Sequence, residues 1–218
     1  MTKNIGKYLL CFLFIILSPL LGIIYYPLHD SSDNHLYNLL INEIIVFFII
    51  LLIIYAIYKS LLKKDFIKLF KIRFDKKMTP LLTILIIFLS VSHLVITSKL
   101  PDTTFINKMY IATGNHFCSI FFVTLVVRIV LGPFLEELLF RGIIYSYMKN
   151  FTNIYSTILI SSIGFGIAHS LFSIDIILYN FLTAVLLGIA RENSKGIVFP
   201  FILHALSNLS VFFIFLVF

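Results

Sequence analysis

The chain has 218 residues, of which 60% are hydrophobic and 12% are charged. Soluble domains carry about 25% charged residues, so this composition excludes an ordinary water-soluble fold and indicates helices that face lipid. The net charge of +7 does not indicate nucleic-acid binding, because eight of the 17 basic residues fall in one stretch, residues 59–77, between two apolar runs. Positive charge in such a connector is typical of a cytoplasmic loop.

Seven hydrophobic segments follow one another along the chain, and each is about long enough for a helix that crosses a bilayer. We therefore predict an all-α fold, a polytopic membrane bundle of about seven transmembrane helices in which residues 1–218 form a single transmembrane domain. We expect the N-terminus to lie in the cytoplasm. In this orientation the basic stretch, and most of the cations that lie in the other short turns, are on the cytoplasmic side. The segments are residues 8–26, 39–58, 80–96, 117–148, 154–170, 174–190 and 197–217.

Two parts of this pattern predict local structure. The connector 59–77 has apolar residues at helical spacing, which predicts an amphipathic helix at the membrane surface. The fourth segment is too long for one untilted span, and Gly132-Pro133 lies in its middle. Because a proline inside a helix removes a backbone hydrogen bond, we expect an interruption and a bend there.

The fourth segment also places two acids and an arginine among leucines and phenylalanines, in Glu136-Glu137-Leu-Leu-Phe-Arg141. A charge at bilayer depth costs about 2.5–3.5 kcal/mol, so these groups must face one another or a wet cavity. Glu137 and Arg141 are four residues apart and can pair on one helix face, and this pair is open to a purely structural interpretation. Glu136 points about 100° away and is free to accept a proton from water.

Histidines in two later segments can join these acids. His169 follows the small residues Ser161, Ser162, Gly164 and Gly166, which allow neighbouring helices to approach closely. His204 and Asn208 form a one-turn pair on the last segment. Histidine can move protons, ligate a metal or stabilise an oxyanion, and an asparagine amide can donate hydrogen bonds. Glu136, His169 and His204 together are chemically sufficient to activate water, with or without a metal.

At these motifs the sequence resembles the CAAX-protease and bacteriocin-processing family (CPBP, also called Abi), which includes the type II CAAX prenyl endopeptidases. The family pattern is Glu-Glu-x-x-x-Arg, then Phe-x-x-x-His, then His-x-x-x-Asn, each on a different membrane helix. Here the first motif ends at Arg141, the second runs from Phe165 to His169, and the third runs from His204 to Asn208. The resemblance covers residues 128–208, which form a catalytic core within the single domain.

The resemblance implies intramembrane endoproteolysis of a peptide or a lipid-anchored protein. By analogy, Glu136 activates the attacking water with the help of His169. His204 and Asn208 stabilise the oxyanion in the same analogy. The family is described both as metalloproteases and as glutamate proteases without metal, so a divalent metal such as zinc remains open and no other cofactor is implied. The catalytic residues are thus Glu136, His169, His204 and Asn208, the structural support is Glu137 and Arg141, and the metal alternative uses Glu136, His169 and His204.

The short chain, without large soluble insertions, favours a bacterial plasma membrane protein. For such a member the resemblance suggests bacteriocin or signalling-peptide processing, or self-immunity. The expected partners are the substrate and membrane lipid, and not nucleic acid. Two alternatives stay open: a non-catalytic immunity or scaffold protein of the same fold, and a proton or ion transporter whose buried Glu and His side chains form a relay. The absence of an internal repeat disfavours the transporter.

Overall fold

The computed structural model describes residues 33–63, 65–96, 122, 125–170 and 172–217, and all regular secondary structure in these ranges is helical. The helices α3 and α9 contain stretches long and apolar enough to cross a membrane, by length and composition. The all-α prediction is confirmed for the described residues. The count of seven spans is not confirmed, and the first expected segment, 8–26, lies outside them. The elements are α2 (Asp33–Leu62), the 3-10 helix η1 (Phe66–Phe70), α3 (Met78–Ile96), η3 (Val126–Leu131), α6 (Gly132–Glu137), η4 (Leu138–Ile144), α7 (Tyr145–Met148), α8 (Ile154–His169), α9 (Ile174–Ser194) and α10 (Val198–Val217).

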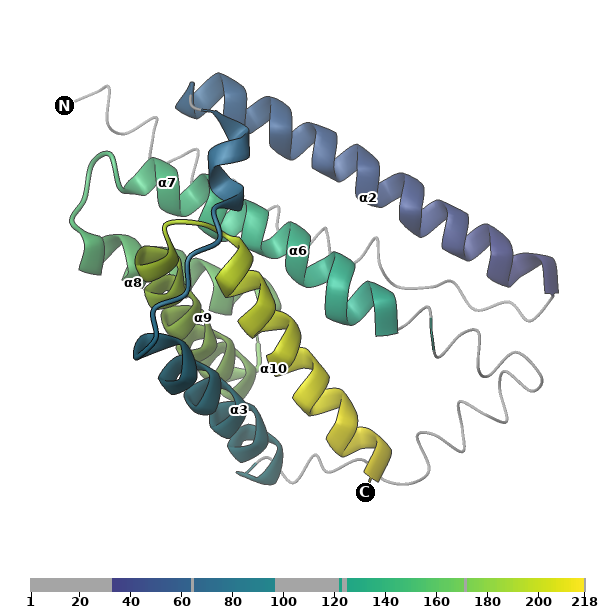
Figure 1. The fold of residues 1–218 in the computed structure, drawn as a ribbon. Helices are drawn as coiled ribbons and strands as arrows, with labels where there is room; N and C mark the ends of the chain where they lie inside the picture. Colours follow the sequence, from purple (N-terminus) through teal and green to yellow (C-terminus); the bar gives the residue numbers. More distant parts are fainter. Residues whose placement is uncertain (1–32, 64, 97–121, 123–124, 171, 218) are drawn as a thin grey trace.

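The helix that carries the two acids lies between α2 and the other helices (Figure 1). It runs through η3, α6, η4 and α7. The helices α8 and α9 form a tightly packed hairpin, and α3 and α10 pack against α9 and against each other. One cluster of buried apolar side chains joins α2, η1, residues 135–148 and α8, while a second joins α3, α9 and α10. The helix that carries Glu136 and Glu137 is therefore packed against α2 on one side and against the other helices on the opposite side, which holds its position.

The connector between α2 and α3 is not the continuous amphipathic helix that we expected. The helix α2 begins six residues before the predicted segment. It ends at Leu62, because the next residue, Lys63, has a φ of 50°. This left-handed backbone conformation cannot continue an α-helix. A five-residue 3-10 helix follows, and Asp65 caps it by accepting the Ile67 N–H at 3.3 Å. The side chain of Leu69 is buried, because η1 packs onto the protein core.

The start of α3 is fixed by a cap. Asp75 accepts the backbone N–H groups of Met78 and Lys77, both at 2.9 Å. These two hydrogen bonds favour the ionised carboxylate and hold the pKa of Asp75 below its usual value.

The fourth segment stays helical through Gly132-Pro133, so the expected interruption is wrong. Pro133 occupies the first turn of α6, directly after the π-helical η3. The N–H of Gly132 donates to the carbonyl of Val127, five residues earlier. A π-helical turn shifts the hydrogen-bond register, which accommodates a proline that has no N–H to donate. A second π-helical stretch, η4, contains Arg141.

The helices α8 and α9 approach closely at a glycine. A Cβ atom added to Gly166 would lie 2.8 Å from the carbonyl oxygen of Ile177 and 3.3 Å from Phe181 on α9. Such distances leave no space for a side chain unless α9 moves. The prediction that small residues before His169 permit close helix packing is confirmed at this position.

We expect Gly166→Ala to lower the free energy of unfolding by about 1–3 kcal/mol, because the added methyl group overpacks the α8–α9 contact. Thermal unfolding of the purified protein measures the change. Ile163→Ala on the same helix is the matched control, since Ile163 is 45% exposed and its truncation should cost less. Equal stability of Gly166→Ala and the wild type would contradict the close packing.

Candidate active site

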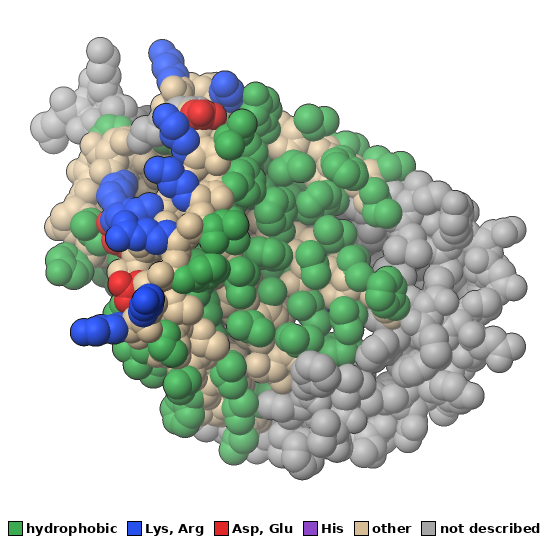
Figure 2. All heavy atoms as spheres, in the orientation of Figure 1, with side chains coloured by type: hydrophobic (Ala, Val, Ile, Leu, Met, Phe, Trp, Pro, Cys, Tyr) green, Lys and Arg blue, Asp and Glu red, His purple; other side chains and the backbone are tan. Residues whose placement is uncertain are grey.

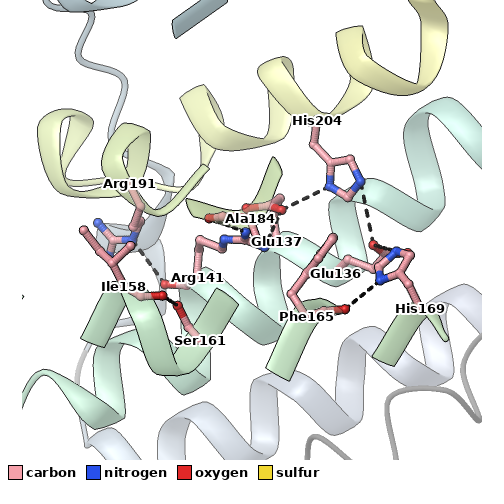
Figure 3. A network of polar contacts seen from close by, with 10 residues as sticks. All are labelled: Glu136, Glu137, Arg141, Ile158, Ser161, Phe165, His169, Ala184, Arg191 and His204. Carbon is pink, nitrogen blue, oxygen red and sulfur yellow. Dashed lines mark hydrogen bonds and ion pairs between the residues drawn. The ribbon is translucent and has the colours of Figure 1, made fainter. Parts of the chain in front are cut away.

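Three helices bring Glu136, His169 and His204 together (Figure 3). Glu136 lies on α6, His169 is the last residue of α8, and His204 lies in the first half of α10. The Oε2 atom of Glu136 is 3.4 Å from Nε2 of His169 and 3.8 Å from Nε2 of His204. Two imidazole nitrogens, from residues far apart in the sequence, thus face the same carboxylate oxygen.

Glu137 forms a second, fully buried layer behind this group. Its Oε1 atom accepts a hydrogen bond from Nη1 of Arg141 at 2.9 Å, and both side chains are completely buried. The Nη2 atom of Arg141 also donates to the carbonyl of Ala184 on α9, at 3.1 Å. The pair predicted from the four-residue spacing is confirmed. The same Oε1 atom lies 3.1 Å from Nδ1 of His204, so the pair also orients a histidine of the site.

Both histidines are anchored through Nδ1. The Nδ1 atom of His169 lies 2.9 Å from the carbonyl oxygen of Phe165, and Nδ1 of His204 faces the Glu137 carboxylate. A carbonyl or carboxylate oxygen only accepts hydrogen bonds, so Nδ1 carries the proton in each ring. In the neutral tautomer, Nε2 of each ring then holds a lone pair directed at Glu136. Such partners fix both the tautomer and the ring orientation.

Phe165 packs at the centre of this arrangement, a role that the sequence did not predict. Its ring is fully buried and lies 4.3 Å from the His169 ring and 5.5 Å from the His204 ring, between centroids. The Arg141 guanidinium lies 4.7 Å from the Phe165 ring centroid, within range of a cation–π interaction. The only sequence signal for this role is its position one turn before His169.

Arg191 is a further residue whose contact the sequence did not reveal. Its Nε–H donates to the carbonyl of Arg141 at 3.1 Å (Figure 3), and its guanidinium lies 5.6 Å from the Tyr145 ring centroid. Arg191 therefore braces the π-helical stretch that carries Arg141.

Asn208 is the predicted site residue that the structure does not bring to the group. Its Nδ2 atom donates to the backbone carbonyl of Arg128 on η3, at 2.9 Å. This hydrogen bond joins α10 to the helix before the acids. A role of Asn208 toward an oxyanion stays a prediction.

The three side chains of the site differ in exposure: Glu136 and His169 are partly exposed, and His204 is buried. The side chains of Glu136 and His169 are 31% and 28% exposed, while that of His204 is 5% exposed. Within the described residues, Oε2 of Glu136 is buried and has no hydrogen-bond partner. When Glu136 and Glu137 are both ionised, the positive Arg141 guanidinium balances only one of them. One negative charge remains, and a single proton on Glu136 or on a histidine neutralises it. The arrangement can therefore hold one proton between Glu136 and the two imidazoles.

A glutamate with two histidines is a donor set that zinc accepts. Among the residues that the structure describes, however, no three His, Cys, Asp or Glu side chains are placed to hold a metal ion. The two Nε2 atoms face Glu136 itself, at 3.4 and 3.8 Å. No chemical step is therefore derived through a metal. Metal dependence stays a question for experiment.

Apolar helices surround the acid–histidine group, an arrangement consistent with a helical membrane protein. Residues 118–210 match the family model described as type II CAAX prenyl endopeptidase Rce1-like. This range contains the acids, both histidines, Arg141 and Asn208. This match supports the CAAX-protease (CPBP) family that the motifs predicted. No curated protein and no solved structure matches the chain.

Proposed function

We propose that this protein is an intramembrane endopeptidase that hydrolyses a peptide bond in a peptide or a lipid-anchored protein, with water as the nucleophile. The observation that supports this most directly is the convergence of two Nε2 atoms on the buried Oε2 atom of Glu136. The match of residues 118–210 to a family model of CAAX-type proteases supports the same reaction class. The mechanism proposed here uses Glu136 and histidine to activate water, without a metal.

In this mechanism Glu136 accepts a proton from water while the water oxygen attacks the carbonyl carbon. The 3.4 and 3.8 Å separations are longer than ordinary hydrogen bonds, and a water can bridge groups at such distances. The Nε2 lone pair of His169 accepts the second water hydrogen and orients the nucleophile. Protonated His204 donates from Nε2 to the developing oxyanion. Glu136 then gives its proton to the amine as the carbon–nitrogen bond breaks.

The surroundings of the site favour a substrate that is held at the membrane. The site lies among apolar helices, and Glu136 and His169 form its exposed edge. A lipid-anchored or amphipathic peptide reaches such a site by diffusing in two dimensions. In a bacterial plasma membrane, this substrate class includes maturing bacteriocins and signalling peptides, and the protein could act in their processing or in self-immunity.

The proposal is tested with the full chain reconstituted in lipid and a library of free and lipidated peptides. We expect the wild type to release peptide fragments, detected by mass spectrometry, and a Glu136→Gln/His169→Gln double variant to release none. Activity should stay within about twofold of its starting value after treatment with a strong chelator. Loss of activity that zinc restores would replace the metal-free mechanism. Ion transport without cleavage would replace the peptidase proposal.

A further inference from the structure

Seven exposed cations lie in the last turn of α2 and in the connector between α2 and α3. None of the seven forms an ion pair with an acid in the described part of the chain. The two acids of the same stretch, Asp65 and Asp75, are engaged as caps for backbone N–H groups. Figure 2 shows Lys and Arg side chains gathered along one edge of the molecule. We name this surface the basic belt: Lys59, Lys63, Lys68, Lys71, Arg73, Lys76 and Lys77.

Exposed apolar side chains alternate with the cations of the basic belt. Ile67 is 77% exposed, Ile72 is 67% exposed and Phe74 is 49% exposed. Next to the basic belt, the visible face is covered by exposed hydrophobic side chains (Figure 2). A nucleic acid or a soluble acidic protein gains little from the isolated aliphatic side chains of Ile67 and Ile72. The boundary between lipid headgroups and acyl chains accommodates cations and apolar side chains together.

The basic belt is fixed to the part of the core that carries the site. The N–H of Ile197, in the α9–α10 turn, donates to the carbonyl of Leu69 at 2.8 Å. A Cβ atom added to Gly196 would collide with the backbone of Lys71, and one added to Gly142 would lie 3.3 Å from the Leu69 side chain. Gly142 directly follows Arg141. The connector therefore packs against the π-helical stretch behind the acids.

We infer that the basic belt binds the headgroups of anionic phospholipids. The inference rests on its exposed cations, on the apolar side chains that alternate with them, and on the packing of the connector against the core. Lipid phosphates neutralise the cations, while Ile67, Ile72 and Phe74 enter the acyl boundary. Because η1 is packed on the core at Leu69, bound anionic lipid stabilises the connector in its docked position. This inference goes beyond the proposed peptidase function and does not depend on it.

The test compares the full chain in nanodiscs of phosphatidylcholine alone and of phosphatidylcholine with phosphatidylglycerol. Native mass spectrometry measures retained lipid, and thermal unfolding measures stability. We expect selective retention of phosphatidylglycerol and a higher unfolding temperature in its presence. A triple variant, Lys68→Gln/Lys71→Gln/Arg73→Gln, should weaken this binding by on the order of 100-fold, at roughly fivefold for each cation. High salt should weaken wild-type binding as well.

The matched control keeps the charge: Lys68→Arg/Lys71→Arg/Arg73→Lys should retain the wild-type preference. Equal retention of the two lipids by the wild type, or an unchanged preference in the glutamine variant, would overturn the inference. So would full competition by inorganic phosphate or an acidic peptide at equal charge, since either would identify a soluble ligand. Lipid retention is measured without any cleavage, so an inactive protein leaves this result intact.

Discussion

Replacing Glu136 by glutamine is expected to lower kcat by about 10³-fold or more while the protein stays folded. A positioned general base contributes typically 10²–10⁴-fold, and glutamine keeps the size of the side chain but cannot accept the proton of water. Glu136 lies at the open edge of the site, with 31% of its side chain exposed, so its replacement breaks no fully buried ion pair. Cleavage kinetics and thermal unfolding of the same preparation separate the two effects.

The matched control is Glu192→Gln, the same change of acid to amide outside the site. Glu192 accepts hydrogen bonds from Tyr145 and Lys149, both at 2.5 Å, and pairs with Lys195. Its loss should lower stability at that end of α9 while leaving the chemical step within about tenfold of the wild type. A folded Glu136→Gln protein with near wild-type kcat would rule out Glu136 as the base.

Relations within a single helix could be predicted from the sequence. Glu137 and Arg141 pair as their four-residue spacing requires, because helical periodicity fixes which side chains share a face. Contacts between helices depend on the depth and rotation of each helix, which periodicity does not determine. The bonds of Arg141 to Ala184 and of His204 to Glu137 join residues 43 and 67 positions apart. Only the likeness to family motifs indicated that the acids and histidines meet.

Asn208 was placed in the site because it lies one helical turn from His204, and this spacing alone does not determine what its side chain contacts. It lies four residues after His204, about 6 Å further along the helix axis, so the two side chains meet different neighbours. His204 reaches Glu137, while Asn208 reaches the Arg128 carbonyl on η3. The connector failed as a prediction for a related reason. Its apolar spacing suits an amphipathic helix, but the left-handed backbone at Lys63 and the packing of Leu69 on the core produce a short 3-10 turn instead.

Replacing Arg141 by methionine is expected to lower the free energy of unfolding by about 3–5 kcal/mol, because the change leaves the Glu137 carboxylate buried without its cation. Both side chains are completely buried, so water cannot compensate. Arg128→Met, on the same helix, is the matched control, since the Arg128 side chain is exposed. Thermal or denaturant unfolding of the two variants measures the difference, and similar stability of both would contradict a buried ion pair.

The double variant Arg141→Met/Glu137→Leu separates stability from chemistry. Removing both charges should recover at least about 2 kcal/mol of the loss, because apolar replacements of a buried ion pair are often neutral or stabilising. Activity should not return, because Nδ1 of His204 would lose the Oε1 atom that lies 3.1 Å away and the ring would no longer direct Nε2 at Glu136. A stable double variant with wild-type kcat would show that the pair serves the fold alone. A stable but inactive one would place Glu137 in the positioning of His204.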